Sequence, residues 1–254
     1  MRVTTFNILH GRSLADGRVD LARFAESVKT LDSDILALQE VDRDQPRSQG
    51  ADLTAVAAEA MGAVAHRFVA ALSGTPGATW MAATGQEQPG TASYGIALLS
   101  RQPVLWWEVV RLPAMPTRVP LLFPGRRRPV LVGDEPRVAL VAAIETPDGE
   151  LTVANTHLSY IPGWNVLQLR RLMRALTSCT SPLLLVGDLN MKPERASRVT
   201  RMRPLATDLT FPAHHPKQQL DHILARGAVE PASAGSAVEL PLSDHRALSV
   251  ALAL

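Results

Sequence analysis

Short apolar runs alternate with segments of helical periodicity along this chain. Residues 183–186 are four consecutive apolar residues closed by Gly187, a pattern that predicts a short strand buried on both faces. Residues 34–40 have the same character, residues 94–100 form a similar run, and residues 2–8 alternate as a strand does. These segments predict the inner strands of a sheet.

Three further segments have the 3.6-residue spacing of amphipathic helices, at residues 21–31, 52–61 and 164–177. The remaining strands are predicted at 67–72, 79–83, 103–112, 137–145, 150–155, 220–224 and after a polar loop at 242–246. Residues 191–215 are expected to be rich in loops. This alternation predicts an α/β architecture with sheet inside and helices outside. No change of composition divides the chain, so we expect residues 1–254 to form one domain.

Polar side chains follow the buried run at 183–186. Asp188 and Asn190 are two residues apart, so in an extended backbone their side chains point the same way. Unpaired polar groups are costly at the end of a buried strand, and hard oxygen donors suit Mg²⁺ or Mn²⁺. The alternative interpretation is an ordinary turn, because Gly, Asp and Asn are common turn residues.

The same placement recurs at other strand ends. The residues concerned are Asn7, Glu40, His157, Asp188 with Asn190, Asp221, and Asp244 with His245 in the loop before the last strand. Ligands of α/β proteins collect at strand ends, and several carboxylates in one place repel each other unless cations or protons compensate. Each residue alone has a structural explanation, such as a turn cap for Asn7 or a hydrogen-bonded core histidine for His157. The recurrence favours one site with a divalent metal.

Composition sets broad limits. The formal net charge is +2, which neither requires nor excludes a polyanionic partner. Cys179 is the only cysteine, so an intrachain disulfide and a metal site built on several cysteines are both excluded. No apolar run approaches the length of a membrane span, and no charged segment with an apolar stretch precedes the first predicted strand, so we expect no signal peptide in this sequence. We expect a monomeric cytoplasmic protein without stable membrane insertion, and the sequence indicates no protein partner.

Six short motifs resemble the endonuclease/exonuclease/phosphatase superfamily, which includes deoxyribonuclease I, and they occur in the order of that family. They are Thr5-Phe6-Asn7, Leu38-Gln39-Glu40, Asn155-Thr156-His157, Gly187-Asp188-Leu189-Asn190, Leu220-Asp221-His222 and Ser243-Asp244-His245. The resemblance covers residues 3–250. It implies a four-layer αββα sandwich, in which two mixed β-sheets pack face to face with helices outside, and a phosphoesterase that uses Mg²⁺, with Mn²⁺ as a possible substitute.

The resemblance also implies roles for individual residues. Glu40 resembles the principal metal ligand, with Asn7 and Asp244 beside the metal. Asp188 and Asn190 resemble the pair that orients and activates the attacking water. His245, paired with Asp221, and His157 resemble the histidines at the scissile phosphate. Arg137 resembles an arginine of the nucleases, and Tyr94 a residue that binds substrate.

Three functions fit these residues. The first is a nuclease-type phosphodiesterase, in which Arg126, Arg127 and Arg128 of the proline- and arginine-rich segment 111–129 would follow a nucleic-acid backbone. The second is a phosphodiesterase or phosphatase acting on a small molecule or a lipid headgroup, favoured by the apolar residues of the same segment. The third is a non-catalytic phosphate-binding module that has kept the fold. The sequence does not determine which group is the general base.

Overall fold

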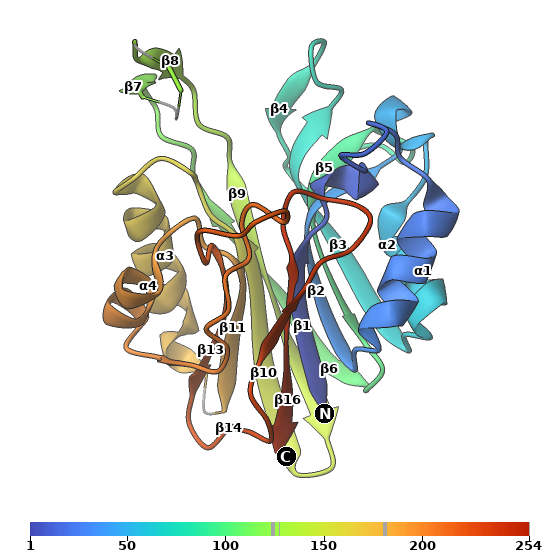
Figure 1. Ribbon diagram of the computed structural model, residues 1–254, viewed down its shortest axis with the longest axis vertical. Coiled ribbons are helices and arrows are strands. Elements are labelled where there is room, and N and C mark those ends of the chain that lie inside the picture. The colour runs from blue at the N-terminus through green and yellow to red at the C-terminus, as the bar shows by residue number, and fades with distance from the viewer. Residues whose placement is uncertain (123–124, 127, 180–181, 254) are drawn as a thin grey trace.

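The computed structural model describes residues 1–254 except 123–124, 127, 180–181 and 254. Two β-sheets pack face to face, and helices cover the outer face of each sheet (Figure 1). The predicted four-layer αββα sandwich is therefore confirmed. The two chain ends lie together at one end of the sandwich (Figure 1).

The first sheet has eight strands among the described residues. In spatial order these are β14 (Glu230–Pro231), β16 (Ala247–Ala253), β1 (Arg2–Asn7), β2 (Ile35–Arg43), β5 (Ser93–Ser100), β3 (Ala65–Gly74) and β4 (Trp80–Ala82), with β15 (Ser236–Val238) also paired to β16. The strands β1 and β2 are parallel, and the other recorded pairs of this sheet are antiparallel. The strands predicted at residues 67–72 and 79–83 correspond to β3 and β4, which pair as an antiparallel hairpin.

The second sheet has six strands among the described residues, and like the first sheet it contains one parallel pair. Its order is β12 (Arg203–Pro204), β13 (Asp221–Arg226), β11 (Leu183–Asp188), β10 (Gly149–His157), β9 (Arg137–Thr146) and β6 (Val104–Leu112). The parallel pair is β10 with β11, and its neighbours are antiparallel. Each sheet therefore has one parallel pair whose carboxyl ends lie side by side, and both pairs end at the end of the sandwich opposite the termini (Figure 1).

The helices begin at residues that cap them. The side chain of Asp20 accepts a hydrogen bond from the backbone N–H of Arg23 at the start of α1 (Leu21–Leu31), and Asp52 caps α2 (Leu53–Met61) in the same way. On the other sheet lie α3 (Trp164–Ala175) and α4 (Pro193–Thr200). Single 3-10 turns occur at Leu9–Gly11, Pro46–Ser48 and Leu176–Ser178. None of the described helices is long and apolar enough to cross a bilayer.

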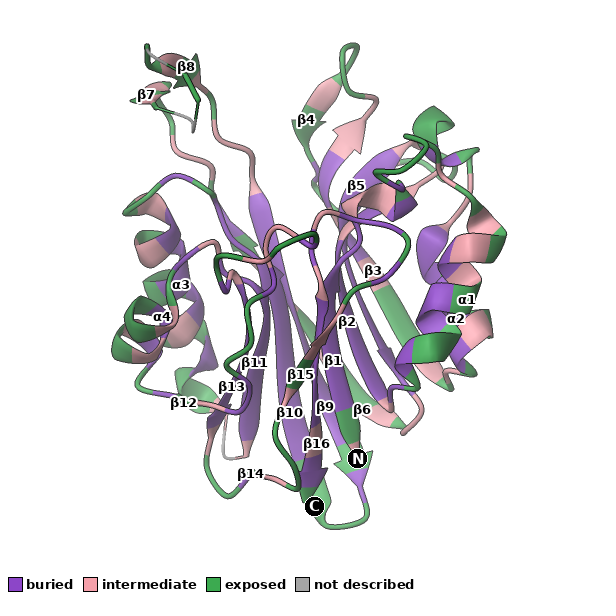
Figure 2. Ribbon diagram, viewed as in Figure 1, coloured by how far each residue is buried: buried purple, intermediate pink, exposed green. Residues whose placement is uncertain are grey.

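Three apolar clusters hold these layers together. One lies between the sheets and includes Val3, Leu98 and Val153. The other two join each sheet to its helices, around Phe24 on one side and Leu169 on the other. The inner strands are buried almost throughout, in accordance with their continuous apolar sequence (Figure 2).

Three features differ from the sequence prediction. The helix α4 lies within residues 191–215, which were expected to be loop-rich. Residues 111–129 contain β7 (Val119–Leu121), which pairs with β8 (Val130–Val132) to form a two-stranded arm. Glu40 was expected to end a strand, but β2 continues to Arg43 because the strand accommodates an extra residue there as a β-bulge.

Candidate active site

The end of the second sheet brings three of the predicted residues side by side. His157 is the last residue of β10 and lies opposite Asp188, the last residue of the parallel strand β11. Asp221 begins the antiparallel strand β13 and lies opposite Asp188 on its other side. All three are buried. Strand register alone therefore places one imidazole and two carboxylates in a row.

The first sheet contributes Asn7 and Glu40. Asn7 ends β1 and is paired with Gln39 of β2, so Glu40 follows at the same end of the sheet. The register of β2 against β5 shifts between Gln39 and Val41, which makes Glu40 the extra residue of a bulge. Its φ of 57° is in the left-handed region, which is strained for a residue with a side chain by about 1–2 kcal/mol. Strain of this kind persists where the surrounding structure imposes it, often at functional sites.

The side chain of Asn7 joins the two sheets. Its Nδ2 donates to Oε1 of Glu40 at 3.2 Å and to Oδ2 of Asp188 at 3.1 Å. Its Oδ1 accepts the backbone N–H of Leu9 at 3.2 Å. One amide thus holds a carboxylate from each sheet and fixes their separation.

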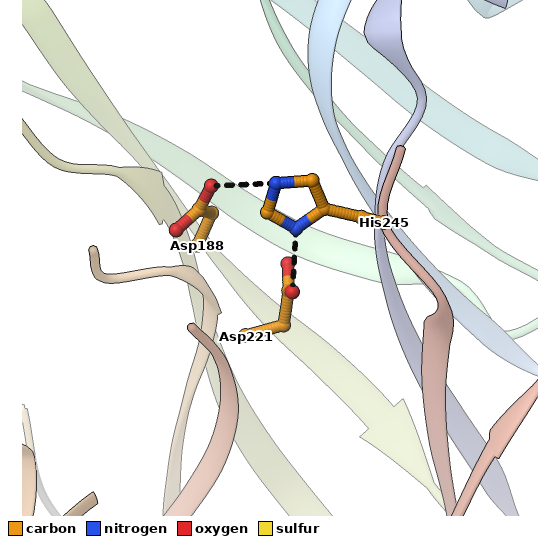
Figure 3. Close-up of side chains that lie close together, drawn as sticks. All are labelled: Asp188, Asp221 and His245. Carbon is orange, nitrogen blue, oxygen red and sulfur yellow. Dashed lines mark hydrogen bonds and ion pairs between the residues drawn. The ribbon is translucent and has the colours of Figure 1, made fainter. Parts of the chain in front are cut away.

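His245 lies between two carboxylates (Figure 3). Its Nδ1 is 2.8 Å from Oδ2 of Asp221, and its Nε2 is 3.8 Å from Oδ2 of Asp188. Burial alone would lower the pKa of His245, but the charge and hydrogen bond of Asp221 and the charge of Asp188 raise it to about 10. The ring is therefore an imidazolium at neutral pH.

The environment of Asp188 makes its carboxylate a stronger base than an ordinary aspartate. Burial and the neighbouring carboxylate of Asp221 raise the pKa of Asp188 to about 7, against the lowering effect of His245 and of its hydrogen bonds. Its Oδ1 accepts the backbone N–H of Asn190 at 2.9 Å. A carboxylate with a raised pKa can take up a proton near neutral pH.

His157 has polar neighbours at both ring nitrogens. Its Nδ1 is 3.3 Å from Nη1 of Arg137, and because a guanidinium has no acceptor, Nδ1 accepts and the proton is on Nε2. That Nε2–H faces Oδ2 of Asp188 at 3.6 Å. Nδ2 of Asn190 lies 3.3 Å from Nε2 but is itself a donor, and it donates to the carbonyl of Leu158 at 3.0 Å. Burial, Arg137 and His245 lower the pKa of His157 well below its ordinary value. His157 is thus a neutral imidazole beside a charged one.

The remaining predicted residues lie at different distances from this centre. Asp244 directly precedes His245, is partly buried, and its charge adds to burial in raising the pKa of Glu40. Tyr94 is buried, and the centroid of its ring lies 5.7 Å from that of Trp80. Arg126 and Arg128 are exposed on the arm formed by β7 and β8, which projects from the site end of the sandwich (Figure 1). Arg127 lies outside the described residues.

Several residues that support the site were not assigned a role from the sequence. The Oγ of Ser243 donates to the carbonyl of Asn7 at 2.6 Å and accepts the N–H of His245 at 3.0 Å. Asn165 of α3 donates to the carbonyl of Asn190 at 2.8 Å. Asn155 and Gln39 are fully buried beneath the site, and each precedes a predicted site residue in a family motif, Asn155-Thr156-His157 and Leu38-Gln39-Glu40.

The donor set fits a hard divalent cation. Glu40 and Asp244 offer carboxylate oxygens at this end of the sandwich. Burial raises the pKa of Glu40 and the charge of Asp244 adds to the rise, and a bound cation would offset both effects. Ligand atoms of Asp188, Asp221 and His245 also lie within 4.8 Å of one another. Because Nδ1 of His245 is bonded to Asp221 and the ring is protonated, this second group is better suited to proton transfer than to metal binding.

Comparison with known proteins agrees with this geometry. A family model described as Endonuclease/Exonuclease/phosphatase family matches residues 4–245. A protein of that description from Beutenbergia cavernae has 24% identity and a TM-score of 0.69 over 100% of this chain and 71% of its own. No curated protein matches the chain significantly.

Two other solved structures share the fold. The mannosyl-6-phosphatase Bt3783 of Bacteroides thetaiotaomicron has 16% identity and a TM-score of 0.64, with full coverage of both chains. Sphingomyelinase C of Streptomyces griseocarneus has 14% identity and a TM-score of 0.61, covering 98% of each chain. At these identities the likeness establishes the fold and leaves the substrate open.

Proposed function

Because the chain belongs to the endonuclease/exonuclease/phosphatase family, whose members hydrolyse phosphate esters, we propose that it is a Mg²⁺-dependent phosphodiesterase of the nuclease type. The observation that carries this proposal is that the site contains two groups of residues with different chemistry, placed next to each other. One group contains the imidazolium of His245 between Asp221 and Asp188. The other contains Glu40, joined to Asp188 through the amide of Asn7. Acid–base groups beside a carboxylate site for a cation suit hydrolysis of a charged ester.

Each residue has a role that follows from its contacts. Glu40 and Asp244, with Asn7 beside them, would hold Mg²⁺, which supplies Lewis-acid stabilisation of charge on the phosphoryl and leaving oxygens. Mn²⁺ is the expected substitute. Asp188, with Asn190 donating its backbone N–H, accepts a proton from the attacking water. The new P–O bond forms as the bond to the leaving group breaks.

The histidines and Arg137 serve the phosphate. His245, kept protonated by Asp221, offers Nε2–H to a phosphoryl oxygen. His157 offers a neutral Nε2–H, and Arg137 behind it keeps that tautomer in place. Prearranged donors of this kind stabilise the charge of the pentavalent transition state, and the loss of one is worth roughly 10²–10³ in rate.

The arm formed by β7 and β8 supports two substrate classes. Arg126 and Arg128 are exposed on it, which favours a nucleic-acid backbone. Leu122 and Leu131 of the same arm are 65% and 66% exposed, which favours the second candidate, a lipid-headgroup or small-molecule phosphodiesterase. Binding without catalysis is the third possibility and is disfavoured by the complete set of acid–base groups.

Hydrolysis of bis(p-nitrophenyl) phosphate and of p-nitrophenyl phosphate tests the proposal. We expect cleavage of the diester with Mg²⁺, none with EDTA, and a loss of about 10²–10⁴ in rate for Asp188→Ala. Asp208→Asn is the matched control, because Asp208 is an exposed carboxylate. Cleavage of the monoester alone would replace the phosphodiesterase by a phosphatase.

The salt dependence of binding separates the two substrate classes. Binding of an uncleavable oligonucleotide should weaken steeply with salt, by about tenfold or more between 50 and 200 mM for several phosphate contacts. Turnover of sphingomyelin or phosphatidylinositol vesicles with no activity on DNA or RNA would favour the lipid-headgroup candidate.

Full activity of Asp188→Ala on bis(p-nitrophenyl) phosphate would contradict the assignment of Asp188 as the base.

A further inference from the structure

A buried amide crosses the sandwich directly beneath the site. Asn155 is on β10 of the second sheet, yet its Nδ2 donates to two carbonyls of the first sheet, at 3.0 Å to Leu38 and 2.8 Å to Ala97. Leu38 and Ala97 are partners across β2 and β5. Asn155 is fully buried. It therefore ties both strands one residue pair before Gln39 and Ile96, which are the last regular pair before the bulge.

Gln39 extends this connection. Its Nε2 lies 2.8 Å from Oδ1 of Asn155 and 3.0 Å from Oγ1 of Thr5 on β1. The four strands β1, β2, β5 and β10 thus meet in one buried polar cluster, defined here as Asn155, Gln39 and Thr5. Hydrogen bonds in a dry interior hold their geometry firmly, because an unpaired donor or acceptor there costs about 1–3 kcal/mol.

The position of this cluster relates it to Glu40. Residue 39 is the last regular residue before the bulge, and Glu40 then takes its left-handed φ of 57°. A residue with that strain relaxes toward the extended region unless its neighbours prevent it. Among the residues that the structure describes, the Glu40 carboxylate has one hydrogen-bond partner, the amide of Asn7 at 3.2 Å. The hydrogen bonds of Asn155 hold the two residues that precede Glu40, by the carbonyl of Leu38 and the side chain of Gln39.

The same amide is coupled to the other half of the site. Asn155 and His157 are two residues apart on β10, so their side chains are on the same face of the strand. A shift of Asn155 relative to Leu38 would therefore change the distance between the strand that carries His157 and the strand that carries Glu40.

We propose that Asn155, assisted by Gln39, is a positioning residue that holds the Glu40 bulge in its metal-binding conformation and sets its register against the His157 strand. This inference rests on the proposed function, in which Glu40 is a metal ligand. Residues that orient a ligand from behind typically contribute 10–100-fold to metal affinity. We therefore expect Asn155→Leu, which has similar volume and no donor, to weaken Mn²⁺ binding by about that factor.

The experiment measures the Mn²⁺ dissociation constant by the electron paramagnetic resonance signal of free Mn²⁺, without substrate. It compares the parent, Glu40→Gln, Asn155→Leu, Gln39→Met and Leu151→Ala. Leu151 is the matched control, because it is buried, lies on the same strand and face as Asn155, and packs in the same core between the sheets. Leu151→Ala should lower the melting temperature and leave the dissociation constant within about twofold, since it creates a cavity away from the bulge.

The double variant Glu40→Gln/Asn155→Leu makes the test specific. If Asn155 acts through Glu40, its substitution should weaken binding in the parent and have no further effect once Glu40 is gone. Equal weakening in both backgrounds would overturn the inference, as would Asn155→Leu and Gln39→Met variants that bind Mn²⁺ like the parent. Should Asn155→Leu not fold, Gln39→Met decides alone.

A different result identifies failure of the proposed function. If Glu40→Gln binds Mn²⁺ as tightly as the parent, Glu40 is not the ligand, and the proposed metal site and the inference both fall. If Glu40→Gln loses binding while both cluster variants keep it, the proposed metal site stands and only the positioning role is refuted.

Discussion

Replacing Asp221 by Asn should remove the charge that keeps His245 protonated. Asp221 is fully buried, its Oδ2 lies 2.8 Å from Nδ1 of His245, and it is the main source of the raised pKa of His245. Without that charge, burial lowers the pKa of the imidazole and the charges of Asp188 and Asp244 oppose this only in part, so the ring should lose its proton at a lower pH than in the parent. The variant keeps the shape of the side chain, so the effect reports on charge.

The magnitude follows from the pKa of His245 in the folded protein, about 10, compared with 6.5 in an unfolded chain. A group whose pKa rises on folding stabilises the protein fully below the unfolded value, and this contribution is lost as the pH rises through the folded value. For His245 the window is pH 6.5 to about 10. The difference corresponds to a free energy on the order of 5 kcal/mol at 1.36 kcal/mol per pH unit.

Urea denaturation at pH 6, 7, 8, 9 and 10 in EDTA measures this contribution. The parent should lose unfolding free energy steadily from pH 7 to 10, while Asp221→Asn should start lower at pH 6 and change much less over the same range. The exposed control Asp208→Asn should follow the parent. A constant difference between parent and Asp221→Asn from pH 7 to 10 would refute the assignment of the proton to His245.

Two further substitutions test how the site is supported. Gly187→Ala should destabilise the fold by roughly 2–6 kcal/mol in urea denaturation, because residue 187 has a φ of 133° and an added Cβ would overlap the carbonyl of Thr156. The control Gly62→Ala has a φ of 68° and open space around it, and should cost about 1–2 kcal/mol. Similar losses for both variants would contradict the steric argument. Ser243→Ala removes the hydroxyl that joins Asn7 to the His245 loop, and we expect a loss of about 1–3 kcal/mol in unfolding free energy. The rate of diester hydrolysis should fall more than in the control Ser233→Ala, which changes an exposed serine. Equal rates in the two variants would show that the loop holds His245 without the Ser243 hydroxyl.

The sequence predicted those elements whose apolar spacing decides their structure. The helix expected at residues 21–31 is Leu21–Leu31, because Phe24, Val28 and Leu31 form a buried face at helical spacing. The helix α4 was missed because only Ala196 and Thr200 of its eight residues are buried, so its sequence lacks an apolar stripe. The arm was missed because its two strands are short and pair only with each other.

The candidate site was predictable as far as strand ends determine it. Asn7, His157 and Asp188 end parallel strands, and Asp221 joins them because an antiparallel strand begins where its neighbour ends. Glu40 was placed at a strand end, whereas it is inside β2 as the extra residue of a bulge. A bulge depends on the pairing of two strands distant in sequence, so no local pattern around Glu40 could have shown it.

The relation between the two sheets explains why the polar residues beneath the site matter as much as those in it. Glu40 is on one sheet and Asp188 on the other, and apolar side chains fill most of the space between the sheets. Such packing excludes water but does not by itself fix register to a fraction of an ångström, because dispersion contacts are weak and non-directional. The directional contacts across the interface at this end include those of Asn7 with Asp188, of His245 with Asp221, and of Asn155 with Leu38, Ala97 and Gln39. Polar contacts at these two levels therefore set the distance between Glu40 and the pair formed by Asp188 and His245, so a change at either level should alter both parts of the site together.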